Sequence, residues 1–146
     1  MKINLWVKYF VTITVLLIMI VLWGYVGNLS STYFKRNFTF NYGYIVIRIL
    51  IGYSIGAILG FDHFISEIRK EGKWRFSLSK VIILGLPSLY ISLTYVFFYS
   101  NVNVHFLQNI IAYPLLSLLR YSPDSVSFFQ LIFGYTIITS FNKTVN

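Results

Sequence analysis

The sequence of 146 residues lacks cysteine and contains few charged residues. The absence of cysteine excludes a disulfide framework, a thiol nucleophile and any cysteine-ligated metal site. Charged residues make up 11% of the chain and hydrophobic residues 57%, whereas soluble domains carry about 25% charged residues. So little polar surface cannot cover a globule in water. The composition therefore predicts an integral membrane protein, with no room for a separate soluble domain.

Acidic residues and alanine are also scarce. Four acids stand against twelve basic residues, giving a net charge of +8. No acid falls within a long apolar run, which argues against transport coupled to protons or cations. The basic residues lie between the apolar runs, a pattern typical of topology control and contact with anionic headgroups, not of nucleic-acid binding. The two alanines, beside abundant Ile, Phe, Tyr and Asn, indicate an AT-rich bacterial genome.

Four apolar runs predict four transmembrane helices, because a helix needs about 20 residues to cross a bilayer. The runs cover residues 5–26, 42–61, 81–99 and 125–141 of a single transmembrane domain. The first run is too long for a signal peptide and lacks a small-x-small cleavage site, so we expect it to be retained. We expect Pro87 to kink the third helix.

Residues 105–120 form an apolar segment of a different kind. Polar side chains recur along one side at helical spacing, which predicts an amphipathic helix lying in the outer interface. A five-span alternative would bury Gln108 and Asn109 in lipid and place the C-terminus outside. The predicted fold class is an all-α membrane protein with four transmembrane helices plus one amphipathic interfacial helix.

The distribution of lysine and arginine predicts that both termini are cytoplasmic. With the N-terminus inside, eight cations lie on the inner side and three on the outer side, as the positive-inside rule requires. The inner set is Lys2, Lys8, Arg69, Lys70, Lys73, Arg75, Lys80 and Lys143, and the outer set is Lys35, Arg36 and Arg120. We therefore expect a multi-pass protein of the cell membrane.

Gly52, Gly56 and Gly60 form a stripe of glycines four apart in the second run. Such a stripe leaves one helix face without side chains, so that a neighbouring helix can approach closely. We expect this face to pack tightly against the first or third run within the chain, in preference to forming a homodimer. Residues 52–56 also match G-x-S-x-G, but a nucleophile elbow needs a strand, a turn and a helix, and one apolar helix does not provide them.

Arg48 is the only charge within the second run, about 9 Å along the helix axis from Tyr42. It is a candidate contact for an anion or a lipid phosphate. Alternatively, it snorkels to the outer headgroups. Asp124 is its best-placed protein partner. Three further candidates for anion or lipid contact are Lys70, Lys73 and Arg75. Together with Trp74 and Lys80 they are expected to form a basic-aromatic collar at the inner leaflet.

No motif ties these residues to a known transporter, channel or enzyme, and none predicts a cofactor or a metal site. The leading hypothesis is a non-enzymatic accessory or assembly component. Its partners would be a bilayer with anionic headgroups and a membrane protein or a second copy of the chain. The alternative is a small oligomeric transporter, channel or lipid translocator that uses Arg48 as an anion contact. A third hypothesis is a lipid-modifying enzyme that uses His105 and Asp124.

Overall fold

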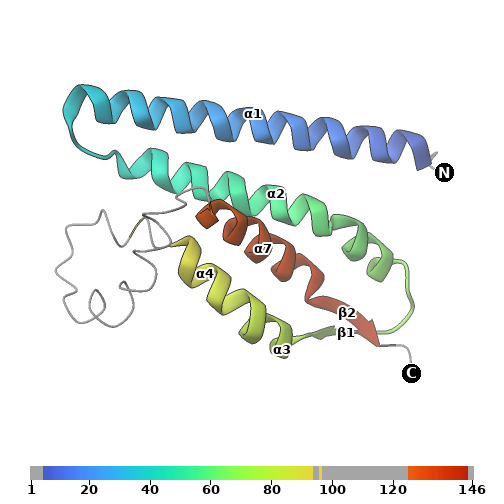
Figure 1. Cartoon of the computed structure of the whole chain (residues 1–146). Helices are drawn as coiled ribbons and strands as arrows, with labels where there is room; N and C mark the ends of the chain where they lie inside the picture. Colours follow the sequence, from blue (N-terminus) through green and yellow to red (C-terminus); the bar gives the residue numbers. More distant parts are fainter. Residues whose placement is uncertain (1–4, 94–95, 97–124, 145–146) are drawn as a thin grey trace.

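The computed structural model describes residues 5–93, 96 and 125–144 and is predominantly helical (Figure 1). Helices make up 83% of the described residues, which confirms the helical class predicted from the sequence. Two of them, Leu5–Asn37 and Tyr42–Ile68, are long and apolar enough to cross a membrane. The interfacial helix predicted at 105–120 lies outside the described residues.

Helix α1 (Leu5–Asn37) has 33 residues and is about 50 Å long. The first apolar run ends at residue 26, but the helix continues because no proline follows and two cations in its last turn favour the negative end of the helix dipole. Phe38 ends it in the left-handed conformation, with φ of 51°. Phe40 then stacks on Phe34, with ring centroids 4.4 Å apart, and reverses the chain.

Helix α2 (Tyr42–Ile68) runs back beside α1 (Figure 1). Asn41 caps it, because its side chain accepts a hydrogen bond of 2.9 Å from the backbone N–H of Gly43. The helix outlasts the apolar run 42–61 by two turns, and these turns carry polar residues. We call the end of the molecule at residues 38–41 the turn end.

The third helical segment, Leu78–Ser92, contains a π-helical turn. It consists of α3 (Leu78–Lys80), the π turn η1 (Val81–Gly85) and α4 (Leu86–Ser92). The backbone N–H of Leu86 donates to the carbonyl of Val81, five residues back, next to Pro87. Proline has no N–H for the regular helical pattern, and a π turn accommodates the loss. The distortion expected at Pro87 takes this form.

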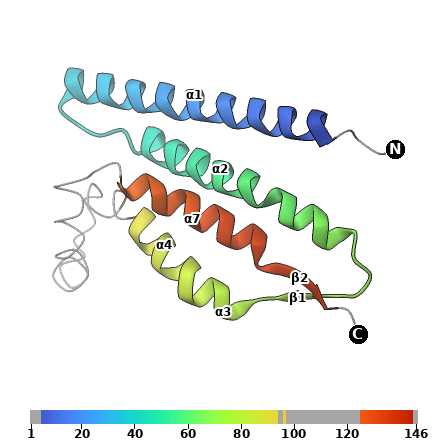
Figure 2. The same cartoon turned by 45° about the vertical axis from the view of Figure 1, so that its right-hand side comes forward.

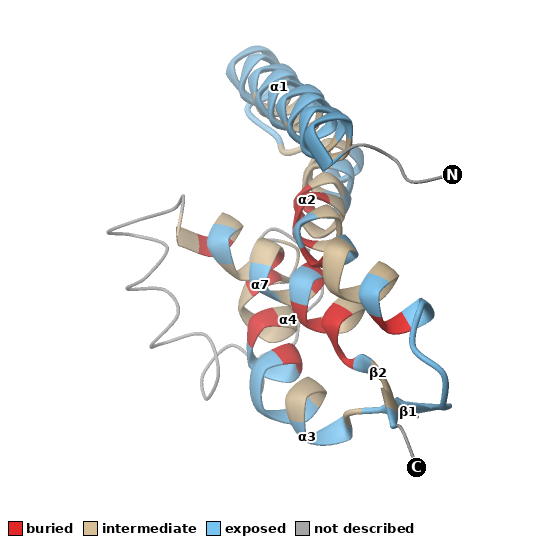
Figure 3. Cartoon of the chain, turned by 90° about the vertical axis from the view of Figure 1, so that its right-hand side faces the viewer, coloured by how far each residue is buried: buried red, intermediate tan, exposed pale blue. Residues whose placement is uncertain are grey.

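Helix α7 (Ser125–Thr139) lies between α2 and α4, parallel to α2 and antiparallel to α4 (Figures 1 and 2). The buried residues gather where these three helices meet, whereas α1 has none (Figure 3). Among the described residues, only three buried side chains are large hydrophobics: Ile49, Ile55 and Val126. The interior consists mostly of glycine, serine, threonine and a few other polar residues.

Two short strands lie at the opposite end, where α1 begins, which we call the terminal end. β1 (Lys73–Phe76) pairs antiparallel with β2 (Phe141–Thr144), and Trp74 lies opposite Lys143. The expectation of a purely α-helical chain is wrong here. Residues 73–76 alternate basic and aromatic side chains, as a strand does, but their partner lies far away in the sequence, so no local pattern reveals the pairing.

Candidate functional site

The three glycines of the predicted stripe lie on α2 against α7. A Cβ atom at Gly56 would lie 2.9 Å from the backbone nitrogen of Tyr135, and one at Gly52 would lie 2.9 Å from the Cβ of Gln130. At Gly60 the nearest side-chain atom of α7 would be 3.1 Å away. The stripe therefore faces another helix of the same chain, at distances that leave no room for a side chain at Gly56. The partner is the helix of the fourth apolar run, so the expectation that it would be the first or third was wrong.

Gly134 of α7 completes this contact from the other side. A Cβ atom there would lie 2.8 Å from the carbonyl carbon of Tyr53 and 3.0 Å from the nitrogen of Ala57. Small residues on both helices thus let the two backbones approach closely. The sequence analysis missed Gly134, because a lone glycine in an apolar run is common in membrane helices and carries no pattern.

Arg48 packs against α1, near the turn end. Its guanidinium carbon lies 3.9 Å from the ring centroid of Trp23. The guanidinium also lies over Gly27, one helical turn after Trp23, where an added Cβ atom would be in ordinary van der Waals contact with the same carbon at 3.5 Å. The Nε atom of Arg48 is buried and has no hydrogen-bond partner among the described residues. Asp124, its expected partner, lies outside these residues.

A cavity of about 110 Å³ lies beside Arg48, between α1, α2 and α7. Gln130 is 3% exposed, and its Oε1 atom has no hydrogen-bond partner within the described part of the chain. Arg48 and Gln130, each with one buried polar atom that has no partner among the described residues, both line this cavity. Its lining residues are Ser30, Phe40, Ile45, Arg48, Ile49, Ser127 and Gln130. Sequence reasoning found only Arg48, because the other polar residues come from different helices.

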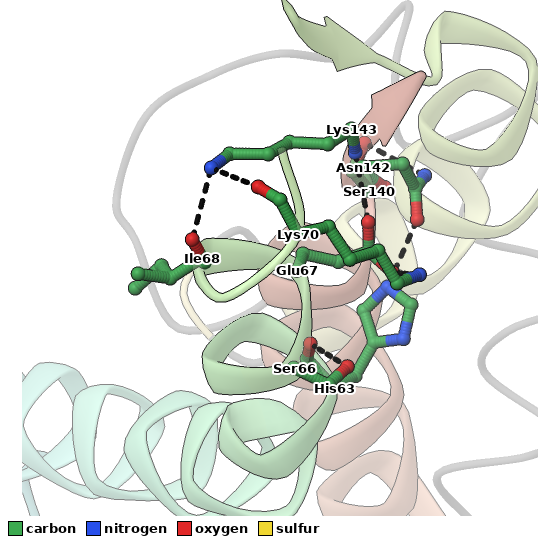
Figure 4. Close-up of polar contacts among 8 residues, drawn as sticks. All are labelled: His63, Ser66, Glu67, Ile68, Lys70, Ser140, Asn142 and Lys143. Atoms are coloured by element: carbon green, nitrogen blue, oxygen red, sulfur yellow. Dashed lines mark hydrogen bonds and ion pairs between the residues drawn. The ribbon is translucent and has the colours of Figure 1, made fainter. Parts of the chain in front are cut away.

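Lys70, predicted as a lipid contact, forms an ion pair with Glu67 in the last turn of α2, beyond the apolar run (Figure 4). The Glu67 side chain is 4% exposed, and it also accepts a hydrogen bond of 2.8 Å from the backbone N–H of Lys143. The bond from Lys143, followed by that from Lys70, holds the pKa of the Glu67 carboxyl below its ordinary value of 4.5. The sequence analysis missed this buried carboxylate.

Lys143 ties the end of the chain to α2. Its Nζ atom donates to the carbonyl oxygens of Ile68 and Lys70, at 2.9 and 2.7 Å (Figure 4). The ammonium group also lies 5.0 Å from the ring centroid of Trp74. A cation at the last carbonyls of a helix stabilises its negative end, so Lys143 is a capping residue for α2.

Lys73 and Arg75, the other two predicted lipid contacts, lie exposed on β1. Their side chains form no ion pair or hydrogen bond with the residues that the structure describes. Trp74, between them, points the other way and stacks on Phe64, with ring centroids 5.7 Å apart. The structure therefore places Lys73 and Arg75 together at the terminal end, whereas Lys70 forms an ion pair with Glu67.

No group of three or more histidine, aspartate or glutamate side chains that could hold a metal ion occurs in the described ranges. His105, the other residue of the enzyme hypothesis, lies outside them. No protein-family model, no curated protein and no solved structure matches this chain. Its function must therefore be argued from the geometry of these contacts.

Proposed function

We propose that the chain is an integral membrane protein of a bacterial cell, with four transmembrane helices and both termini in the cytoplasm. The helices are α1, residues 42–61 of α2, the segment Leu78–Ser92 and α7. It acts without catalysis, as an accessory or assembly component of a larger membrane complex.

The distribution of side chains supports the membrane location. The described surface carries large exposed hydrophobics along α1, α2 and α7, such as Phe10, Leu50 and Phe128, while the interior is small and polar. Soluble proteins rarely expose continuous apolar surfaces of this extent. Helices in lipid instead associate through small residues and interhelical hydrogen bonds.

The two ends of the molecule support the orientation. α1 begins and β2 ends at the terminal end (Figure 1). This end carries the exposed cations Arg69, Lys73 and Arg75, whereas the turn end carries Lys35 and Arg36. The larger number of cations at the terminal end favours a cytoplasmic position for it.

The observation that carries the accessory role is the exposure of α1. No residue of this 33-residue helix is buried, and its main neighbour is α2. The opposite face presents Gly24, where no described heavy atom lies within 4 Å of an added Cβ, and Asn28 one turn later. A small residue and an amide on a free helix face allow a partner helix to approach and form hydrogen bonds.

Single cysteines test the orientation, because the natural chain has none. We expect Lys35→Cys to react with a membrane-impermeant maleimide on intact cells, and Lys73→Cys to react only after lysis. The cysteine-free protein is the control. Labelling of both positions from one side, or recovery of the chain as a folded protein without detergent, would contradict the proposal.

Affinity purification in mild detergent tests the accessory role. We expect a defined membrane protein to co-purify with the wild type and to be lost with Gly24→Leu, which places a large side chain on the free face of α1. Leu50→Phe, a change at an exposed apolar position of α2, is the matched control and should retain the partner. Equal recovery from both variants would exclude this face as the contact.

The cavity beside Arg48 favours a second candidate function, that of a small oligomeric transporter, channel or lipid translocator for anionic substrates. A cation buried within a membrane protein marks a substrate or ion pathway by default. Under this function Arg48→Ala should abolish flux of the anion across vesicles while the protein folds normally. Unchanged flux in this variant would exclude the transport function, and the accessory role would remain.

A further inference from the structure

We propose that the cavity at Arg48 binds a phosphate group. Arg48 supplies the charge, and Ser30, Ser127 and Gln130 supply hydrogen bonds. This inference goes beyond the accessory role, and it names the ligand chemistry for the second candidate function.

The position of the guanidinium carries the argument. Trp23 lies 3.9 Å from its central carbon, within the range of a cation–π contact. The Nε atom is buried without a partner among the described residues, but Arg48 also lines the cavity, where the terminal N–H groups of the guanidinium are available to a ligand. A buried donor without an acceptor is costly, and more so when it is charged. Planar guanidinium groups bind phosphate oxygens through two parallel hydrogen bonds.

The remaining lining groups suit an anion with several oxygens. The hydroxyl groups of Ser30 and Ser127 form no hydrogen bond within the described part of the chain and can donate. Gln130 also lines the cavity, and the NH₂ group of its carboxamide can donate. Ser127 lies in the first turn of α7, a 15-residue helix whose positive dipole end favours negative charge.

The cavity has room for a group larger than a single water. Its volume of about 110 Å³ exceeds the roughly 30 Å³ that one water occupies in the liquid. Among the described residues that line it, Arg48 is the one that carries a charge, and a guanidinium group within a membrane favours a counter-charge. A phosphate, on a lipid headgroup or free in solution, supplies both the charge and the acceptors.

The test uses the full chain in dodecyl maltoside, a detergent without phosphate. Its thermal midpoint is followed as inorganic phosphate replaces chloride at constant ionic strength, and separately as dioleoylphosphatidylglycerol is added to the micelles. The lipid arm rests on the proposed membrane location, whereas the inorganic arm does not. If the proposed membrane location is wrong, the cysteine labelling will show it. If the phosphate site is wrong, the thermal midpoint will show it, so the two proposals can fail independently.

We expect a saturable rise of the midpoint in at least one arm. A rise with the lipid alone assigns a headgroup, and a rise in both arms assigns the phosphate group itself. Arg48→Gln should weaken the apparent affinity roughly tenfold or more, while Arg36→Gln, an exposed arginine in the last turn of α1, should leave it unchanged. Ser127→Ala, which keeps Arg48, should weaken it less and covers the case in which Arg48→Gln does not fold.

Three results would overturn the proposal. The first is a wild-type midpoint that rises in neither arm. The second is an unchanged affinity in a folded Arg48→Gln variant or, if that variant does not fold, in Ser127→Ala. The third is an equal loss in Arg36→Gln, which would show general charge attraction in place of a site.

Discussion

At the residue scale, one substitution made at two glycines should have opposite effects. Gly56→Ala places a Cβ atom 2.9 Å from a backbone nitrogen of α7, so the helices must separate, at a cost of about 1–3 kcal/mol. Gly24→Ala meets no described atom within 4 Å and gains up to about 1 kcal/mol in helix propensity. Thermal unfolding in detergent compares them, and similar midpoints for the two variants would contradict the packing described.

Glu67 should make the stability of the terminal end depend on acid pH. Its pKa is lowered in the folded protein, so its contribution is fully present above the ordinary value of 4.5 and is lost as the pH falls through the lower folded pKa. The free energy of unfolding should therefore decrease across this range in the wild type. The decrease should be smaller in Glu67→Gln and unchanged in Glu71→Gln, an exposed acid. An identical pH dependence in all three would exclude this role.

The residues of the site differ in how far sequence could reveal them. The glycines of α2 recur every four residues, and Arg48 is an isolated charge in an apolar run, so both stand out locally. Gln130 and Gly134 have no such pattern, because their roles arise only when α7 lies against α2. The sequence indicates that Lys70 is a free cation. Its ion pair with Glu67 becomes apparent only when the fold buries the Glu67 carboxylate.

At the element scale, the hydroxyl of Tyr53 on α2 lies 2.6 Å from the Oγ atom of Ser92 on α4. A double-mutant cycle of Tyr53→Phe and Ser92→Ala should give a coupling free energy of about 0.6 kcal/mol, the average for hydrogen bonds between membrane helices. Unfolding in detergent measures it. Additive effects of the two substitutions would mean that the bond does not hold these helices together.

Removal of β2 should open β1 without unfolding the helices. A chain ending at Ser140 loses the strand pairing and the capping of α2 by Lys143. We expect faster hydrogen exchange at the amides of residues 73–76 and little change in α1. A chain ending at Thr144 keeps both features and is the matched control. Equal exchange in the two chains would show that the pairing contributes nothing.

The helices themselves could be predicted from apolar runs, but their ends could not. Hydropathy marks where a chain prefers lipid, and it does not register that α1 continues as a helix through polar residues to Asn37. It also extends the fourth run to residue 141, although α7 ends at Thr139 and a strand follows. These boundaries depend on caps and on pairing across the fold, which hydropathy does not encode.

At the scale of the whole molecule, the helices differ greatly in length. α7 has 15 residues, about 22 Å, whereas a bilayer core is about 30 Å thick. Under the proposed topology with four transmembrane helices, a bilayer must thin around α7, at a cost that grows with its thickness. We expect a higher thermal midpoint in nanodiscs of phosphatidylcholine with 14-carbon chains than with 18-carbon chains. A midpoint that rises with chain length would contradict membrane spanning by α7.

The pairing of β1 with β2 also bears on biosynthesis. The ribosome completes α1, α2 and β1 long before it adds the four residues of β2. Until then Trp74 and Phe76 have no strand opposite them, and Glu67 lacks the N–H of Lys143. Assembly of the terminal end therefore waits until β2 has been synthesised, and a polypeptide that stops before β2 lacks both the strand pairing and the hydrogen bond from Lys143 to Glu67.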